Sequence, residues 1–264
     1  MSLTYGAYLK LDELLALQQP LSAGPEHDEL LFIIIHQTYE LWFKQILHEL
    51  DHLHDLLAHG DVPRVLHTLK RVLTILKVLV EQIDILETMT PVEFLSFRDR
   101  LEAASGFQSY QFREIEFALG HKHPAIPERF PEDSEPQRRL ATRLAQPTLW
   151  DAFLQFLAVN RYPVPSAVLA RDVTQSVEPS PDVQCILIDI YHTNAALSEV
   201  CERLVDLDEG LQEWRYRHVK MVERTIGNKR GTGGSEGVKY LAATLGKPFF
   251  PDLWMIRTEL GRAG

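Results

Sequence analysis

The segment QILHELDHLHDLL contains two histidines four residues apart, with a glutamate between them. His48, Glu49 and His52 match the H-E-x-x-H pattern, in which two histidines on one helical face bind zinc and the glutamate acts as a general base. The pattern has two free positions, so a histidine-rich helix also contains it by chance. The direction of these side chains therefore decides whether the segment indicates a zinc hydrolase.

A helix over residues 27–59 turns this histidine pair away from the helix's apolar stripe. At 100° per residue, His48 and His52 lie on the opposite side, among charged neighbours. These neighbours are Lys44, Glu49, Asp51 and Asp55, and the stripe consists of Phe32, Ile35, Tyr39, Phe43, Ile46, Leu47, Leu50 and Leu57. A hydrolytic zinc site needs a closed cleft, so we interpret the pair as part of a solvated face and keep the zinc hydrolase as a remote alternative.

Two other histidines occupy positions inside apolar stripes. His36 lies at the centre of the stripe just described, and His218 takes a similar position in the last long helix. The stripe around His218 consists of Leu207, Leu211, Trp214 and Met221. An imidazole in apolar surroundings costs free energy unless it has a partner. Either the two rings face one buried ligand, or each is a core histidine bonded to a backbone carbonyl or a tyrosine hydroxyl; spacing does not identify a haem.

Arg98 interrupts the apolar face of a short helix expected over residues 91–101. It shares that face with Phe94, four residues before it, and Leu101, three residues after it. A guanidinium in this position favours a planar anion, such as a carboxylate held by two hydrogen bonds. The alternative is that Arg98 extends to water beside the acidic residues that follow it.

The glycine-rich segment KRGTGGSEG follows the last long helix. It is not a Walker loop, because G-x-x-x-x-G-K-[ST] is absent, and it is not a dinucleotide fingerprint, because no strand precedes it. Its glycines allow the backbone to approach a ligand closely, so we expect a loop that closes over a pocket with Thr232 as its polar tip. The glycines are Gly231, Gly233, Gly234 and Gly237.

The composition excludes several classes of protein. The chain has 264 residues, of which 45% are hydrophobic and 24% charged, a profile typical of a globular domain. A formal net charge of -10 argues against binding to nucleic acid or to an anionic membrane. The longest apolar run, LLFIII, is too short to span a bilayer. With two cysteines and no signal peptide in the sequence, we expect a cytoplasmic protein.

The elements that position these residues are expected to be helices throughout, because no convincing period-two strand interrupts the helical periodicity. The sequence predicts an all-α bundle of long helices in a single domain over residues 1–264. A second long helix begins at Pro63, after a turn near Gly60, and forms a hairpin with the first. A last long helix is expected over residues about 204–226.

Shorter segments complete the predicted architecture. Thr90, Pro91 and Glu93 form a capping box at the start of the short helix. The proline-rich stretch over about residues 124–182 favours a small excursion of loops and short helices. Residues 1–25 form an N-terminal arm.

Five blocks of the sequence together resemble the tryptophan 2,3-dioxygenase family. The blocks are LTYGAYLKLDELL, DELLFIIIHQTYELWFKQILHEL, ILETMTPVEFLSFRDRLEAASGFQSYQFR, EWRYRHVKMVERTIG and KRGTGGSEGVKYL. They occur in the order of the family and extend from Leu3 to Leu241, so the resemblance covers nearly the whole chain. It implies a haem buried between helices.

The resemblance also implies roles for single residues. His218 would be the axial ligand of the haem iron, and His36 the distal histidine beside the indole N–H of the substrate. Arg98 would pair with the substrate carboxylate. The pocket and its closing loop would include Phe32, Ile35, Phe94, Leu101, Ser105, Gly231, Thr232, Gly233 and Gly234. Tyr5 and Tyr8 resemble residues that reach into the site of a neighbouring subunit.

The implied reaction is the insertion of dioxygen across the C2–C3 bond of L-tryptophan, which gives N-formyl-L-kynurenine in the first step of the kynurenine pathway. The implied cofactor is one haem b per subunit, ferrous when active, with dioxygen as co-substrate. The implied assembly is a homotetramer that exchanges N-terminal arms. Discrimination for L-tryptophan would come from Arg98 and the apolar slot, because a buried guanidinium without its carboxylate is costly.

Three positions differ from what is common in the family. Phe94 stands where many bacterial relatives have a tyrosine, so one hydrogen bond to the carboxylate, on the order of 1 kcal/mol, would be missing. Glu236 adds a charge to the glycine loop, and Ile35 makes the distal side drier. Two alternatives therefore stay open: a relative that oxidises another indole derivative, and a non-catalytic haem or gas sensor that would need His218 but not Arg98.

Overall fold

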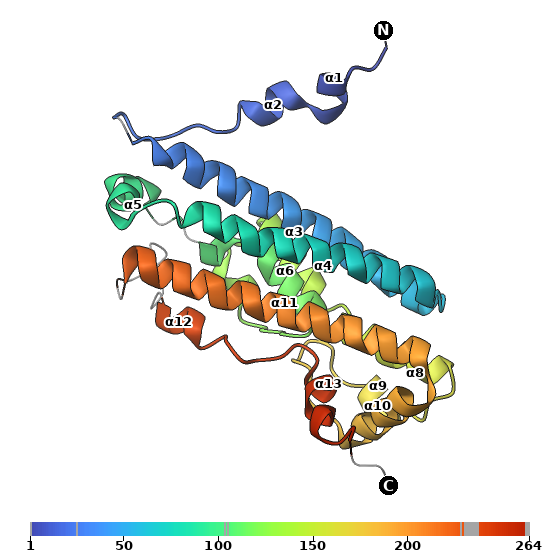
Figure 1. Ribbon diagram of the computed structural model, residues 1–264. Coiled ribbons are helices and arrows are strands. Elements are labelled where there is room, and N and C mark those ends of the chain that lie inside the picture. The colour runs from blue at the N-terminus through green and yellow to red at the C-terminus, as the bar shows by residue number, and fades with distance from the viewer. Residues whose placement is uncertain are drawn as a thin grey trace.

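The computed structural model describes residues 2–24, 26–102, 104, 106–227, 229 and 238–261. All regular structure in these ranges is helical, as the sequence predicts (Figure 1). None of the described helices has the length and apolar character needed to cross a membrane.

Three long helices lie side by side and form the frame of the molecule (Figure 1). They are α3 (Asp28–Ala58), α4 (Val62–Leu86) and α11 (Ala195–Ile226). A turn at Gly60, whose φ of 72° suits glycine, joins α3 to α4. Where α4 and α11 cross, the backbone of Gly210 approaches Leu76 so closely that an added Cβ would lie 3.2 Å from its Cδ1. The turn at Gly60 and the packing of α3 on α4 confirm the predicted helical hairpin.

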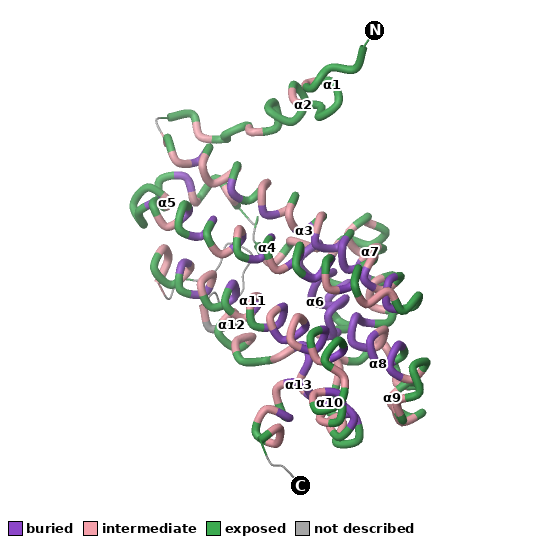
Figure 2. The backbone as a smooth tube through the Cα atoms, turned by 45° about the vertical axis from the view of Figure 1, so that its right-hand side comes forward, coloured by how far each residue is buried: buried purple, intermediate pink, exposed green. Residues whose placement is uncertain are grey.

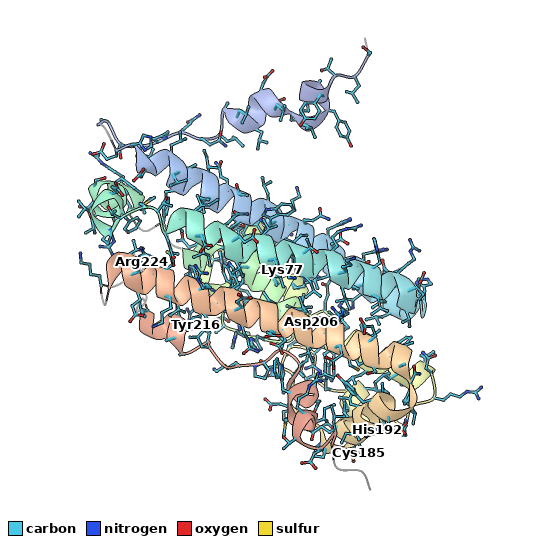
Figure 3. The ribbon with its side chains drawn as sticks, viewed as in Figure 1. Lys77, Cys185, His192, Asp206, Tyr216 and Arg224 are labelled. Atoms are coloured by element: carbon cyan, nitrogen blue, oxygen red, sulfur yellow. The ribbon has the colours of Figure 1, made fainter. Side chains whose placement is uncertain are left out.

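The predicted start of the last long helix is wrong, because α11 begins at Ala195, nine residues earlier than expected. The side chain of Asn194 accepts a hydrogen bond from the backbone N–H of Leu197 and thereby caps the first turn. The apolar spacing of Leu197, Val200, Cys201 and Leu204 continues through this first part, so the periodicity itself extends to the observed start. Figure 3 shows Tyr216 and Arg224 on the outer side of α11, where both residues are exposed.

Shorter helices pack around this frame. They are α5 (Pro91–Phe97), η1 (Arg98–Leu101), η2 (Gly106–Gln108), α6 (Tyr110–Leu119), η3 (Pro127–Arg129), α7 (Glu135–Leu144), α8 (Leu149–Val159), α9 (Ser166–Leu169), α10 (Pro181–Thr193), α12 (Val238–Ala242), α13 (Pro251–Met255) and η4 (Ile256–Thr258). The proline-rich stretch thus contains α7, α8 and α9. Trp150 and Phe153 of α8 belong to the main core, whereas Leu140 of α7 packs in a small separate cluster. Figure 2 shows the buried part of the tube concentrated in α6, α8 and the inner faces of the long helices.

The N-terminal arm extends away from the helical body (Figures 1 and 2). It contains α1 (Tyr5–Leu9) and α2 (Leu11–Leu15), and neither helix has a buried residue. The base of the arm is attached to α3 by Glu29, whose carboxylate accepts the backbone N–H groups of Leu21 at 2.7 Å and Ser22 at 3.0 Å. The arm thus presents apolar side chains to solvent while its base is fixed.

Candidate active-site cavity

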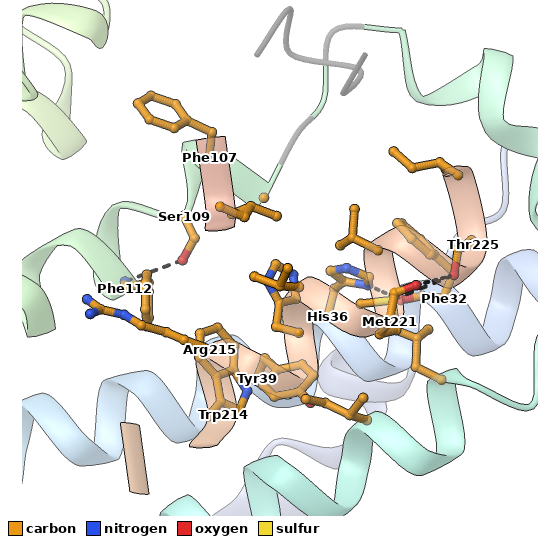
Figure 4. A pocket seen from close by; sticks show the side chains of 18 of the residues that line it. Phe32, His36, Tyr39, Phe107, Ser109, Phe112, Trp214, Arg215, Met221 and Thr225 are labelled. Carbon is orange, nitrogen blue, oxygen red and sulfur yellow. Dashed lines mark hydrogen bonds between the residues drawn. The ribbon is translucent and has the colours of Figure 1, made fainter. Parts of the chain in front are cut away.

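A cavity of about 280 Å³ lies between α3, α5, α6 and α11 (Figure 4). This volume lies just below the range of roughly 300–1,000 Å³ that is typical of pockets for small molecules. Two long helices line it with residues at the same spacing, i, i+4, i+7 and i+11, which places each set on one helical face. The two sets are Phe32, His36, Tyr39 and Phe43 from α3, and Trp214, His218, Met221 and Thr225 from α11. The structure therefore brings His36 and His218 to one cavity.

His36 offers an unprotonated ring nitrogen to the cavity. Its Nδ1 lies 2.7 Å from the backbone carbonyl of Phe32, and only a protonated nitrogen can donate to a carbonyl. Desolvation lowers the pKa of His36, and the carbonyl and Glu40 oppose this shift without reversing it. The ring is therefore neutral near pH 7, with Nε2 as a hydrogen-bond acceptor. The ring of Phe32, 4.0 Å away between centroids, fixes its orientation.

His218 is held by stacking rather than by hydrogen bonding. Its ring lies parallel to the indole of Trp214, at 5.2 Å between centroids and an interplanar angle of 4°. No hydrogen bond to either ring nitrogen occurs among the described residues. Desolvation, with contributions from the charges of His36 and Arg113, lowers the pKa of His218 to about 4. A neutral imidazole with unbonded nitrogens is the form that binds metal ions.

Arg98 lies at one end of the cavity with Phe94 and Leu101. The predicted capping box at Thr90 is confirmed, but the helix ends at Phe97, and Arg98–Leu101 form a separate 3₁₀ turn. Phe97 is fully buried and its ring lies 5.6 Å from that of Phe32, which anchors the turn to α3. The cavity end around Arg98 is therefore built on a packed aromatic cluster.

The other residues expected in this site, or in the site of a neighbouring subunit, fall into three groups. Ile35 is buried in the core and does not line the cavity. Tyr5 and Tyr8 lie on the arm, 76% and 71% exposed, away from the cavity of their own chain. Ser105, Gly231, Thr232, Gly233, Gly234 and Glu236 lie outside the described residues.

A buried ionic cluster in the cavity wall was not anticipated from the sequence. Glu116 accepts hydrogen bonds from Arg113 at 2.5 Å and from Arg215 at 2.8 Å, and all three side chains line the cavity. The only signal in the sequence is the spacing of Arg113 and Glu116, three residues apart on one helix. That spacing is usual for surface ion pairs as well, so it does not indicate burial.

The zinc interpretation finds no support in the structure. His48 is exposed and His52 is partly exposed. The expectation that Glu49 belongs to the solvated face is wrong, because its side chain is buried and accepts hydrogen bonds from Arg71 at 3.0 Å and Gln45 at 2.6 Å. The carboxylate lies in the contact between α3 and α4, where it pairs with Arg71. Within the described ranges, no three histidine, cysteine, aspartate or glutamate side chains form a candidate metal site.

Comparison with known proteins identifies close relatives. A family model described as "Tryptophan 2,3-dioxygenase" matches residues 1–149 and 183–260. The tryptophan 2,3-dioxygenase of Herpetosiphon aurantiacus is 62% identical over 259 residues, which cover 98% of this chain and 99% of the relative. The protein of the same name from Anaeromyxobacter dehalogenans is 54% identical, covering 98% and 97%. That from Kineococcus radiotolerans is 47% identical, covering 98% and 92%.

Proposed function

Because the chain belongs to the tryptophan 2,3-dioxygenase family and is an enzyme that oxidises tryptophan with dioxygen in the kynurenine pathway, we propose that the cavity binds one haem b. His218 would bind its iron, and L-tryptophan would lie beside His36. The observation that supports this most is the arrangement of two histidines, from two distant parts of the chain, around one largely apolar cavity.

The residues of the cavity fit a haem. The ring nitrogens of His218 have no hydrogen-bond partner among the described residues and suit an iron ligand, and the aromatic and aliphatic walls suit the face of a porphyrin. The haem supplies the binding and activation of dioxygen, whose triplet ground state otherwise reacts slowly with a closed-shell indole. The protein supplies orientation and the exclusion of water.

His36 orients the substrate in this proposal. Its Nε2 accepts a hydrogen bond from the indole N–H, because Nδ1 already donates to Phe32. Phe32 and Phe94, whose ring centroids are 5.8 Å apart, pack on the indole. The C2–C3 bond of the indole breaks, one oxygen atom goes to each carbon, and the product is N-formyl-L-kynurenine.

Arg98 binds the carboxylate of L-tryptophan. It lies in a partly buried position at the cavity end formed by Phe94 and Leu101, where a guanidinium pairs with a carboxylate more strongly than in water. The roles of Ser105 in the pocket, of Thr232 at the amino-acid end of the substrate, and of Gly231, Gly233 and Gly234 in a closing loop rest on the resemblance alone.

The arm supports a homotetramer in which each arm packs on a neighbouring subunit. Leu3, Tyr5, Tyr8 and Leu15 are each more than 70% exposed. Burial of such side chains contributes roughly 1.5–3 kcal/mol each, so a contact with another copy is favourable. Tyr5 and Tyr8 then complete the neighbour's site. A chain that lacks residues 1–17 should sediment as a smaller species than the full chain; an unchanged tetramer would contradict the arm exchange.

The proposed haem site is tested by loading the full-length protein with haem and recording its visible spectrum. The wild type should give an intense Soret band with one haem per subunit, and His218→Ala should shift the band and weaken binding. His67→Ala is a matched control, because His67 lies on α4 outside the cavity lining. Equal spectra for His218→Ala and the wild type would refute His218 as the iron ligand.

A further inference from the structure

The cavity has two ends that differ in their aromatic surroundings. At the end formed by α5, the rings of Phe94 and Phe97 pack on Phe32 of α3. At the other end, three turns further along α3, Phe43 packs on Phe112 of α6. Figure 4 shows the same separation, with Phe112 and Arg215 on one side of His36 and Phe32 and Thr225 on the other. Each end has its own cationic side chains.

The end opposite Arg98 contains two arginines around one carboxylate. We call Arg113, Glu116 and Arg215 the arginine cluster; their side chains are 8%, 6% and 5% exposed. Glu116 is the only carboxylate bonded to either arginine in the described part of the chain. Arg113 Nε and Arg215 Nη1 are both buried without an acceptor there. Each arginine therefore has an unused N–H donor in the wall of the cavity.

The arginine cluster has one positive charge in excess. Two guanidiniums face a single carboxylate, and arginine does not lose its proton in a protein. His121, whose Nδ1 lies 3.5 Å from Arg215 Nη2, adds no charge, because desolvation and then the charge of Arg215 lower its pKa to about 4. An uncompensated buried charge and unsatisfied donors are both unfavourable. A bound anion would correct both.

Aromatic rings hold the two guanidiniums in position. The Cζ atom of Arg113 lies 5.2 Å from the ring centroid of Phe107 and 5.3 Å from that of Phe112. The Cζ atom of Arg215 lies 4.8 Å from the ring centroid of Phe249. Side chains fixed in this way lose little further entropy when an anion binds. The cluster is thus a preorganised site for a carboxylate.

We infer that Arg113 and Arg215 bind a carboxylate of the haem, that is, one of its propionates. This inference rests on the proposed function. Arg215 precedes His218 by three residues on α11, which places it about 4.5 Å along the helix axis from the iron ligand. A haem bears its acid groups on the edge of the ring that surrounds the metal, so one residue of α11 binds the iron and another binds the acid group.

The substrate carboxylate is a weaker candidate for the same site. L-Tryptophan has a single carboxylate, and Arg98 lies at the end where Phe32 and Phe94 form the aromatic slot. The arginine cluster lies at the other end, beyond His36 along α3. One substrate molecule of this size does not reach both ends while its indole remains between Phe32 and Phe94.

The test compares haem with its dimethyl ester, in which both propionates are esterified. Full-length apoprotein is titrated with each porphyrin, and binding is followed by the Soret band. The wild type should bind the free acid roughly tenfold to a hundredfold more tightly than the ester, as expected for hydrogen bonds to a charged group. Arg113→Met and Arg215→Met should each weaken binding of the free acid and leave binding of the ester unchanged.

Arg217→Met is a matched control from the same helix. Arg217 does not line the cavity and pairs instead with Asp84 at 2.5 Å and Glu87 at 3.5 Å. This variant should keep the wild-type preference for the free acid. Arg113→Met and Arg215→Met each leave one arginine for Glu116, so the remaining pair is neutral, and the apoproteins should melt no lower than the wild type.

Three results would overturn the inference. The first is equal affinity of the wild type for haem and its ester, which would leave the proposed haem site intact. The second is an equal loss of both affinities in Arg215→Met, which indicates a merely structural role. The third is an unchanged haem affinity with a raised KM for L-tryptophan, which assigns the cluster to the substrate. Failure to bind either porphyrin would refute the proposed function, and with it the inference.

Discussion

Asp208 fastens the C-terminal segment to α11, and its replacement by asparagine should destabilise the protein measurably. The side chain is fully buried. Its Oδ2 accepts the backbone N–H groups of Phe249 at 2.8 Å and Phe250 at 3.1 Å and the indole N–H of Trp254 at 3.0 Å. Its Oδ1 accepts from Gln212 at 2.9 Å. Two distant parts of the chain thus meet at one carboxylate.

The size of the effect follows from these contacts. A hydrogen bond to a charged group contributes about 1.5–3 kcal/mol to stability, and a neutral one contributes about 0.5–1.5 kcal/mol. Weakening the three bonds to Oδ2 in this way therefore loses roughly 3 kcal/mol. Part of this loss is offset, because burial raises the pKa of Asp208 and a neutral amide is easier to desolvate. We expect Asp208→Asn to reduce the free energy of unfolding by about 2 kcal/mol. Asp208→Ala should reduce it further, because three buried donors then lack an acceptor.

The assay is urea denaturation followed by circular dichroism, at one fixed protein concentration because an assembly couples stability to concentration. Asp206→Asn is the control, since Asp206 lies two residues earlier on α11 and forms a half-exposed pair with Arg203 at 2.7 Å. Its effect should stay below about 1 kcal/mol. If Asp208→Asn and Asp206→Asn have the same denaturation midpoint, the role assigned to Asp208 is refuted.

Three further substitutions test other parts of the structure. Arg98→Leu should lower kcat/KM for L-tryptophan roughly a hundredfold and remove the preference over tryptamine, which lacks the carboxylate; steady-state kinetics measures both. Lys122→Met should reduce the free energy of unfolding by roughly 2 kcal/mol, because the buried ammonium donates to three backbone carbonyls at 2.7–3.0 Å. Urea denaturation measures this change, and Lys220→Met, at an exposed site, is the control. Acidification should release the arm. Desolvation raises the pKa of Glu29, but hydrogen bonds from Ser22 and Leu21 outweigh this effect and lower the pKa overall. The contribution of the carboxylate to holding the arm is therefore complete above pH 4.5 and is lost as the pH falls through the lower, folded-state pKa. Glu29→Gln should loosen the arm already at pH 7, as hydrogen exchange at residues 21 and 22 would report.

Each of these expectations has a result that would contradict it. An Arg98→Leu variant that still prefers L-tryptophan to tryptamine would place the substrate carboxylate elsewhere. A Lys122→Met variant as stable as Lys220→Met would show that its three carbonyls find other donors. Unchanged protection of the arm in Glu29→Gln, or in wild type at a pH below the folded-state pKa of Glu29, would show that the carboxylate does not fasten it.

The sequence was sufficient to predict that the long helices exist and which residues lie on their inner faces, although α11 begins nine residues earlier than expected. An apolar stripe with a period of 3.6 is determined by the residue types within a few helical turns, so His36 and His218 could be placed on the inner faces from the sequence alone. The short helix at Thr90 was predictable for the same reason, since its capping box is complete within four residues. The end of that helix at Phe97 was not, because the 3₁₀ turn depends on packing against α3.

The sequence was insufficient where burial depends on distant partners. Glu49 is buried because Arg71 of the neighbouring helix pairs with it, and the arginine cluster joins α6 to α11 across about a hundred residues of chain. Helical periodicity assigns such charged residues to the surface. Ile35, which only the resemblance placed in the pocket, lies in the core, as its position on the apolar stripe of α3 indicates.

The most direct test of the central claim is the fate of L-tryptophan under ¹⁸O₂. Haem-loaded, ferrous protein is given L-tryptophan and labelled dioxygen, and the product is analysed by mass spectrometry. The account predicts N-formyl-L-kynurenine with two ¹⁸O atoms, formed without an external reductant at each turnover. Haem-loaded protein that leaves L-tryptophan unchanged, or a product with a single labelled oxygen, would contradict it.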